Sequence, residues 1–521
     1  MPALYQITAR IIAAALLWGV AMFAAAETPD AYNASDTAAL HVLNRLGYGP
    51  RPGDVEAVKR MGIERYIESQ LQPAAIPLPA ALQDRLASLP VQQQSVGDTL
   101  AQYLSNRRAS AKGDEDAKEK QRLTARNIVL QTSEARLLRA IESPRQLEEV
   151  MVDFWFNHFN VFIGKGLDNA LVASYERDAI RPHVFGNFRD LLGATAKHPA
   201  MLFYLDNWLS TSPDFQPRRE QGERGQGARA RAKGLNENYA RELMELHTLG
   251  VDGGYQQRDV TELARMLTGW SFTPQELARG GATFRFDARR HDNGMKQWLG
   301  QAIAPDGIGE GERALDVLAM HPATAHHLAF KLAQYFVQDN PPPALVERLA
   351  QRYLAVHGEI RPVLRTLFAS PEFLSPSAVG AKFKTPMQFI VSAMRAGGLP
   401  ADNLRPQLGM LRQLGMPLYG CQTPDGYKNT EAAWLNPDSL GRRISFANAI
   451  ASGRNPRAAR DGDMEPFPTT DDTPARRPAD PNELLRTLGP SVSPATRQAL
   501  AGQPMRLQAA MVLGSPDFMR H

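Results

Sequence analysis

The sequence predicts an all-α protein: mostly helical, with a bundle-like core, long irregular loops and at most a short β-hairpin. Three observations predict this class. Apolar residues recur at the three- and four-residue spacing of helices along most of the chain. The alternation of apolar and polar residues that marks half-buried strands is scarce. The only cysteine is Cys421, so no disulfide within the chain can take the place of a hydrophobic core.

The N-terminus has the features of a secretory signal peptide. Arg10 supplies a positive charge, and residues 11–26 form an apolar, uncharged run that ends in three alanines before Glu27. We therefore predict a signal peptide over 1–26, whose removal leaves a periplasmic or secreted protein without a membrane span. The alternative is an uncleaved anchor, because the run is only a little shorter than the roughly 18 residues that a spanning helix needs.

Charge and composition limit the classes of partner. The formal net charge is +4 for 521 residues, and no pattern of a nucleic-acid-binding module is present, so we expect no nucleic-acid partner. The one dense basic cluster, at 217–233, either contacts an anionic polymer or lipid surface or is a solvated loop.

Start and stop signals divide the chain into many short helices. The predicted helix 34–46 begins at Asn33 or Ser35, carries leucines at helical spacing and ends at Gly47. The same signals predict helices at 53–61, 63–71, 126–142, 145–163, 169–180, 183–196, 199–208, 235–249, 259–268, 312–319, 322–337, 343–356, 360–368 and 384–396.

We expect one main helical domain over 27–450, with a C-terminal helical segment over 484–521 packed on it. Between them, 451–483 has the composition of a disordered linker or loop. Within the main domain, charged or Gly-rich stretches predict irregular loops at 107–125, 211–234 and 271–311, the last with a short hairpin at Thr283–Phe286. The alternative for the charged stretch 107–125 is an exposed helix.

The first candidate segment is the apolar helix 147–162, LEEVMVDFWFNHFNVF. His158 lies in the middle of its aromatic face, and Asp153, Asn157 and Asn160 share the opposite side. A helix this apolar is central in a fold, so its polar side chains need partners there. We take Asn157 and His158 as candidate catalytic residues, with His158 as a buried acid–base group or metal ligand. The alternative is a core histidine with one buried hydrogen bond.

The second candidate segment is the predicted helix NENYARELMELHTLG. At about 100° per residue, Glu242 and Glu245 share one side of it and His247 lies on the other flank. The string therefore lacks the H-E-x-x-H spacing of zinc proteases and the Glu-x-x-His of di-iron bundles, and metal dependence stays open. The two carboxylates either act as acid and base on a substrate or form ion pairs with Arg241 and Arg265.

Further candidates follow downstream. Asp259 stands at the start of the next predicted helix, and His291 and Asp292 stand in the irregular segment after it. Loops carry sites on rigid scaffolds, so His291 and Asp292 are better candidates than core residues. The sequence contains no G-x-S-x-G elbow, P-loop or dinucleotide fingerprint, so it assigns no cofactor.

Several segments resemble, in the same order, a bacterial family called domain of unknown function 1800. These segments are 41–71, 151–162 (MVDFWFNHFNVF), 198–207, 236–270 (beginning NENYARELMELHTLG), 291–296 and 321–337. The resemblance implies a large, helix-rich exported protein with no established activity, and a second exported protein of phosphatase-like fold as a partner. One departure is Tyr427, which follows Gly426 where the family pattern has tryptophan.

Two functions from different classes remain open. The first is a hydrolase or lyase that acts on an envelope or extracellular polymer or ester. Its site would draw on Asn157, His158, Asn238, Glu242, Glu245, His247, Asp259, His291 and Asp292, since carboxylates and imidazoles can remove and donate protons. The second is a non-catalytic binding or scaffolding protein for the phosphatase-like partner. The arrangement of the two candidate helices distinguishes these functions. If their polar faces meet at an open pocket, the enzyme is favoured over the scaffolding protein.

Overall fold

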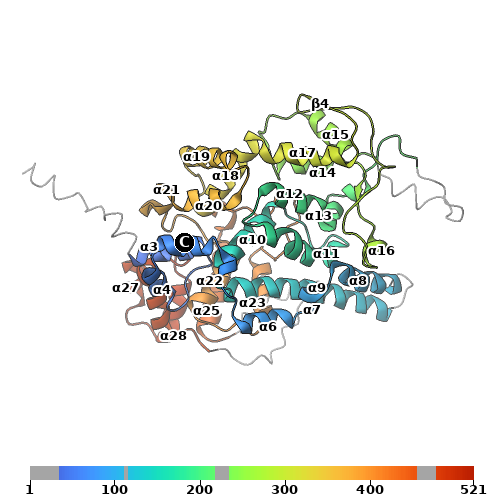
Figure 1. The fold of residues 1–521 in the computed structure, drawn as a ribbon. Helices are drawn as coiled ribbons and strands as arrows, with labels where there is room; N and C mark the ends of the chain where they lie inside the picture. Colours follow the sequence, from blue (N-terminus) through green and yellow to red (C-terminus); the bar gives the residue numbers. More distant parts are fainter. Residues whose placement is uncertain (1–34, 111–114, 217–233, 455–476) are drawn as a thin grey trace, which may run out of the picture.

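The computed structural model describes residues 35–110, 115–216, 234–454 and 477–521 (Figure 1). Within these ranges nearly all regular structure is helical, and the strands form two antiparallel pairs. The predicted all-α class is confirmed. The predicted signal peptide and most of 211–234 and 451–483 lie outside the described residues. No helix in the described ranges is both long and apolar enough to cross a membrane.

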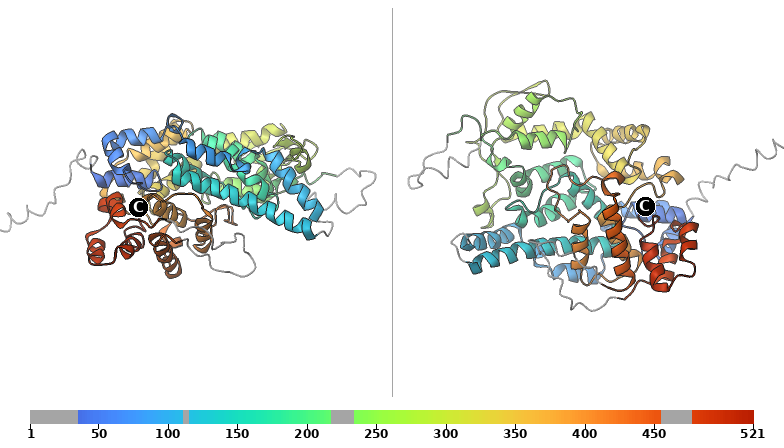
Figure 2. Two further views of the ribbon diagram at one scale, coloured as in Figure 1. Left: turned by 90° about the horizontal axis from the view of Figure 1, so that it is seen from below. Right: turned by 180° about the vertical axis from the view of Figure 1, so that it is seen from behind.

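The first part of the chain packs around one long helix, α9. Its elements are α3 (Asp36–Arg45), α4 (Asp54–Met61), α5 (Ile63–Gln70), η1 (Pro73–Ala75), α6 (Ala80–Ala87), α7 (Pro90–Gln93), α8 (Val96–Ser110) and α9 (Glu115–Glu142). Helices α8 and α9 lie side by side, as Figure 2 shows. The irregular loop expected at 107–125 is therefore wrong on both sides of 111–114. A charged stretch stays helical there because the two helices shield each other's apolar side while the charges face water.

The central part carries both candidate segments. Its elements are α10 (Gln146–His158), α11 (Asp168–Ser174), η2 (Tyr175–Ile180), η3 (Arg181–His183), α12 (Phe188–Lys197), α13 (Pro199–Tyr204), η4 (Asn207–Leu209), α14 (Glu237–Glu245) and α15 (Gln257–Met266). In Figure 1, α10 lies near the middle of the molecule, with α12 and α13 beside it and α14 and α15 above.

The segment after α15 is mostly irregular. It contains β1 (Trp270–Ser271), α16 (Pro274–Leu277), β2 (Arg285–Phe286), β3 (Lys296–Trp298) and β4 (Gln301–Ile303). The pair β1–β2 joins Trp270 to Phe286, whereas the true hairpin is β3–β4. The hairpin expected at Thr283–Phe286 is therefore misplaced, because Phe286 finds its partner across the buried Trp270 and not within its own turn.

The last part returns to helices. They are α17 (Ile308–Met320), α18 (Pro322–Phe336), α19 (Pro343–Ala355), α20 (Ile360–Phe368), α21 (Pro371–Leu374), η5 (Pro376–Ala378), α22 (Pro386–Ala396), α23 (Arg405–Gln413), α24 (Glu431–Trp434), α25 (Pro437–Ala451), α26 (Pro481–Leu488), η6 (Gly489–Ser491), α27 (Pro494–Leu500) and α28 (Met505–Leu513). Helix α28 packs on α25 and α26, and η6 packs on α3, so the two ends of the described chain meet.

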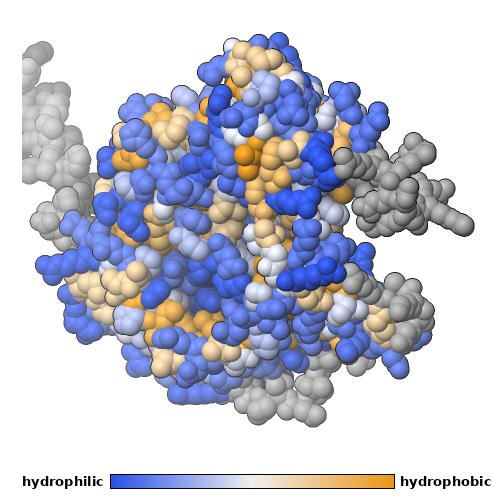
Figure 3. Space-filling view, turned by 45° about the vertical axis from the view of Figure 1, so that its right-hand side comes forward, coloured by the Kyte–Doolittle hydropathy of each residue, from blue (hydrophilic) through white to orange (hydrophobic). Residues whose placement is uncertain are grey.

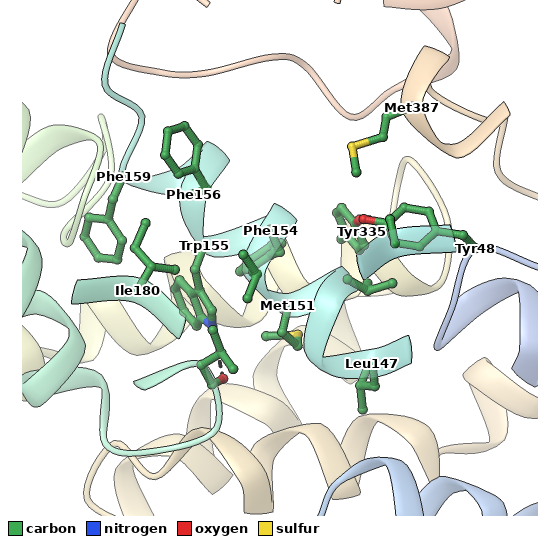
Figure 4. Packing of buried hydrophobic residues seen from close by; sticks show 14 of the residues in the cluster. Tyr48, Leu147, Met151, Phe154, Trp155, Phe156, Phe159, Ile180, Tyr335 and Met387 are labelled. Atoms are coloured by element: carbon green, nitrogen blue, oxygen red, sulfur yellow. Dashed lines mark hydrogen bonds between the residues drawn. The ribbon is translucent and has the colours of Figure 1, made fainter. Parts of the chain in front are cut away.

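Helix α10 is the centre of the core. Trp155 is fully buried, its ring packs against Phe154 and Phe159, and its indole N–H donates to the Val184 carbonyl at 3.3 Å (Figure 4). Burial of each such ring contributes about 1.5–3 kcal/mol to the free energy of unfolding. The apolar character of this helix all round thus matches its central position.

A buried charge network fixes α10 against α9 and η2. Arg136 donates to Asp153 at 2.6 Å and contacts Glu176 at 3.4 Å, and Tyr419 donates to Glu176 at 2.7 Å. Burial by itself would lower the pKa of Arg136, but interactions with Tyr419, Glu176 and Asp153 raise it above its ordinary value, so the guanidinium stays charged. Asp153, expected to need a partner, therefore has one.

The surface is largely hydrophilic. On the face in Figure 3, apolar residues form small patches separated by hydrophilic ones. Scattered apolar residues of this kind are normal on a protein surface and mark no interface by themselves.

Candidate functional site

A surface cleft of about 450 Å³ lies where α13 and α14 meet the loop after Tyr419. Its polar and charged lining comes from segments far apart in the sequence: Lys165, Tyr204, Asn238, Glu242 and Gln422, with Pro424 beside them. Another cleft of about 450 Å³ contains Arg189 and Lys197, but both cations are paired with Glu312, at 2.8 and 2.6 Å. The first cleft holds a predicted site residue, and we take it as the candidate site.

Helix α14 brings Glu242 to the cleft wall. The helix begins at Asn236, whose side chain accepts from the Tyr239 N–H at 3.2 Å. Tyr239 and Leu243 are buried. Glu242 is half-buried and lies on the side of α14 that lines the cleft. Asn238, one turn earlier, lines the same cleft, since residues four apart share a helix face.

The pKa of Glu242 is raised to about 7. Burial is the main cause, and the neighbouring carboxylates of Glu245 and Asp425 add to it, while Arg241 acts in the opposite direction. The expected ion pairs do not form: Arg241 contacts Glu237 and Gln257 instead. The Glu242 carboxyl makes no hydrogen bond within the described part of the chain. With a pKa of about 7, it is present in both protonation states near neutral pH.

Arg265, the other expected partner, is also engaged elsewhere. It pairs with Glu262 and with Asp292, at 2.9 Å in each case. Glu245 accepts a hydrogen bond from the Tyr255 hydroxyl at 3.3 Å. The two glutamates of α14 are thus neighbours of like charge and not members of a neutralised ion-pair set.

The opposite wall carries a cation and a phenol. Lys165 lies 3.2 Å from Asp206 and also donates to the Tyr204 carbonyl. The Tyr204 hydroxyl donates to the Gln422 carbonyl at 2.7 Å, which ties α13 to the loop. Asp168, close to Lys165, is fully buried, and burial raises its pKa well above the ordinary value.

Asn157 and Asn160 hold the loop that forms the third wall. Asn157 donates to the Tyr427 carbonyl at 2.8 Å and accepts from the Tyr427 N–H at 2.7 Å. Asn160 donates to the carbonyls of Cys421 and Thr423, at 3.0 and 2.8 Å. Asn157 therefore does not line the cleft and acts on it only through the loop that forms this wall.

His158 and His247 lie behind this wall, in a closed cluster with His327. The ring centroids of His247 and His327 are each 6.2 Å from that of His158. His158 donates through Nε2 to the His247 carbonyl at 3.1 Å, and its Nδ1 has no partner in the described residues. Burial, followed by the Lys331 charge, lowers the pKa of His247 to about 3 and that of His327 to about 4.

These histidines make the fold sensitive to acid. The pKa of His247 is lower in the folded chain (about 3) than in the unfolded chain (about 6.5), so its contribution is complete above pH 6.5 and is lost as pH falls toward 3. At pH 5 the loss is about 2 kcal/mol of unfolding free energy for this residue. We expect His247→Gln to reduce the fall in stability between pH 7 and 5 by that amount, measured by urea unfolding. His326→Gln, at an exposed position of α18, is the control, and an unchanged slope in the His247 variant would refute the prediction.

The structure places Asp259, His291 and Asp292 away from the cleft lining. Asp259 accepts from the Gln256 and Leu299 N–H groups, at 2.8 and 2.9 Å, and so caps α15 and anchors the strand loop. His291 Nε2 lies 3.0 Å from Glu310, which Lys296 contacts at 2.6 Å, and all three side chains are fully buried.

No group of three or more His, Cys, Asp or Glu side chains in the described ranges is arranged to hold a metal ion. The family model with the description "Protein of unknown function (DUF1800)" matches residues 41–520. The chain belongs to this family. No curated protein and no solved structure matches it.

Two of the residues at the cleft of this DUF1800 protein, Glu242 and Asn238, were predicted from the sequence as site residues. Lys165, Tyr204 and Asp425 were not. Glu242 was found because carboxylates at three-residue spacing share a helix side. The other three residues lie on segments that are remote from α14 in the sequence. No spacing in the sequence indicates that Lys165, in a loop, lies near Glu242, which follows several helices later. Asn157 and Asn160 could be recognised from the sequence, because polar residues in an apolar helix need hydrogen-bond partners.

Proposed function

We propose that this DUF1800 chain is a hydrolase or lyase acting on an envelope or extracellular polymer or ester, with Glu242 as its general acid–base group. The observation that carries the proposal is a half-buried carboxyl with a pKa of about 7 on the wall of an open cleft. Proton transfer is most efficient when the pKa of the group lies near the working pH, because both forms are then available.

The cleft supplies the other requirements of such chemistry. In ester hydrolysis Glu242 takes a proton from water as the water oxygen bonds to the carbonyl carbon, and returns it to the leaving oxygen as the ester bond breaks. In elimination it takes the proton next to a carbonyl, and the departing oxygen receives that proton. Lys165 and Asn238 line the same cleft and provide donors for the oxygen on which negative charge develops.

The N-terminal segment supports a reaction outside the cytoplasm. Residues 1–26 carry the pattern of a signal peptide, which supports a periplasmic or secreted protein. A cleft that is open at the surface suits a polymer, whose chain can lie across it. The exported phosphatase-like partner that the family resemblance implies would then share the compartment.

The proton affinity of Glu242 is the direct test. The protein is prepared with glutamate carrying ¹³C in the side-chain carboxyl, and Glu242→Gln identifies the Glu242 resonance by its absence. We expect this resonance to titrate with a midpoint near pH 7, well above the usual acidic range of a glutamate side chain. A midpoint below pH 5 would overturn the proposal.

Activity is then sought on nitrophenyl esters and on uronate-containing polysaccharides, followed by release of nitrophenol and by the absorbance of unsaturated products. Turnover that depends on Glu242 supports the enzyme. An ordinary midpoint together with no turnover on either class would favour the scaffolding function instead.

A further inference from the structure

We infer that Asn157 and Asn160 are positioning residues of the cleft, which hold the loop Cys421–Tyr427, and with it Asp425, against Glu242. The inference rests on the proposed function and deepens it, because it names the part of the chain that sets the surroundings of the acid–base group. Neither asparagine touches the cleft itself. Both act through the backbone of the loop.

The attachment is specific in geometry. Asn157 bonds to both the N–H and the carbonyl of Tyr427, at 2.7 and 2.8 Å, as a neighbouring strand would. Asn160 is buried and donates to two carbonyls of the same loop, those of Cys421 and Thr423. Four hydrogen bonds thus join two side chains at the end of α10 to backbone groups of one short loop.

The loop fits closely against the helix end. Gly426 has a φ of 69°, and a Cβ there would lie 2.3 Å from the Asn157 carbonyl oxygen. Any larger residue at this position must push the loop away from α10. The asparagines and the glycine therefore serve one purpose, which is to keep the loop in contact with the helix.

The position of this loop matters because three of its residues, Gln422, Pro424 and Asp425, lie near Glu242. Gln422 and Pro424 line the cleft together with Glu242, and the Tyr204 hydroxyl donates to the Gln422 carbonyl. Asp425 stays ionised, since hydrogen bonds from Lys428 and Thr423 lower its pKa more than burial raises it. Its negative charge disfavours ionisation of Glu242. The lining of the cleft and the position of this charge both depend on the loop staying in place.

The test measures the ¹³C carboxyl titration of Glu242 in Asn157→Ala and Asn160→Ala. Loss of the attachment should hydrate the cleft and release Asp425, so we expect the midpoint to fall by roughly half to one pH unit. Gly426→Ala moves the loop without altering either asparagine and should shift the midpoint in the same direction. Asp425→Asn should produce the part of the shift that is due to charge.

Asn187→Ala is the matched control. Its side chain also accepts a backbone N–H, from Arg189 at 2.9 Å, and donates to a backbone carbonyl, of His357 at 2.8 Å, but it contacts no part of the cleft. It should lower stability without moving the Glu242 midpoint. If the wild-type midpoint is near 7 and the asparagine and glycine variants leave it there, the positioning role is wrong and the proposed function stands. If the wild-type midpoint is ordinary, the proposed function itself fails.

Discussion

Replacing Glu242 with Gln is expected to lower kcat/KM by about 10²- to 10⁴-fold, the usual contribution of a positioned acid–base group. Gln keeps the shape and helix propensity of the side chain but cannot take up or release a proton at neutral pH. The carboxyl is only half-buried and makes no hydrogen bond within the described part of the chain, so the fold should be unaffected. Steady-state rates on the substrate class identified by the nitrophenyl and polysaccharide assays give the measurement.

Two variants of the same helix sharpen this prediction. Glu237→Gln is the control, because Glu237 accepts from Gln257 and Thr261 at the start of α14 and should leave the rate unchanged. Glu245→Gln removes a like charge beside Glu242 and should move the acidic limb of the pH–rate profile to lower pH. A Glu242→Gln protein that retains more than half the wild-type rate would exclude the assigned role.

Replacing Glu310 with Gln should destabilise the fold by about 3–5 kcal/mol, because it leaves a buried ammonium without its anion. The side chains of Glu310, Lys296 and His291 are all fully buried. Burial raises the pKa of Glu310, but hydrogen bonds from His291, Lys296 and the Asp306 N–H outweigh it and keep the carboxyl ionised. Lys296 would then lose the partner that offsets its desolvation. Urea unfolding followed by circular dichroism measures the change.

Glu312→Gln is the matched control on the same helix. Glu312 also joins two cations, Arg189 and Lys197, but its side chain is 32 % exposed, so the loss should be about 1 kcal/mol or less. The double variant Lys296→Met/Glu310→Leu should recover part of the loss, since no charge remains unpaired. Equal effects of Glu310→Gln and Glu312→Gln would show that burial does not decide the strength of these pairs.

Local patterns explain which elements could be predicted. Helices such as α18 and α22 follow from apolar spacing and from caps at His321 and Thr385, both of which act within one turn. The sequence left 115–125 open between a helix and an irregular loop, because the packing of this helix on α8 is not revealed by the sequence of that stretch. The pairing of β1 with β2 was misplaced for the same reason.

The candidate residues show the same difference between local patterns, which the sequence reveals, and tertiary contacts, which it does not. Carboxylate spacing was enough to place Glu242 and Glu245 on one side of a helix. The assignment of His291 to a loop was also correct, but its burial beside Glu310 and Lys296 depends on contacts between segments that the sequence does not connect. Asp259 was predicted to start a helix, but α15 begins two residues earlier, at Gln257, and Asp259 is its third residue, whose side chain accepts from the Gln256 N–H.

By itself, the sequence determined that the chain is helical, where most helices begin and end, and that the α14 carboxylates share one side, because caps and periodicity act over a few residues. Only the tertiary structure decided which of the polar residues share the cleft and which are bonded inside the core. It also decided that Glu242 has a pKa of about 7, since that value arises first from burial and then from Glu245 on the same helix, with a smaller contribution from Asp425, which is remote in the sequence. Desolvation and electrostatic interactions depend on distances in space, and those are set when the whole chain has packed.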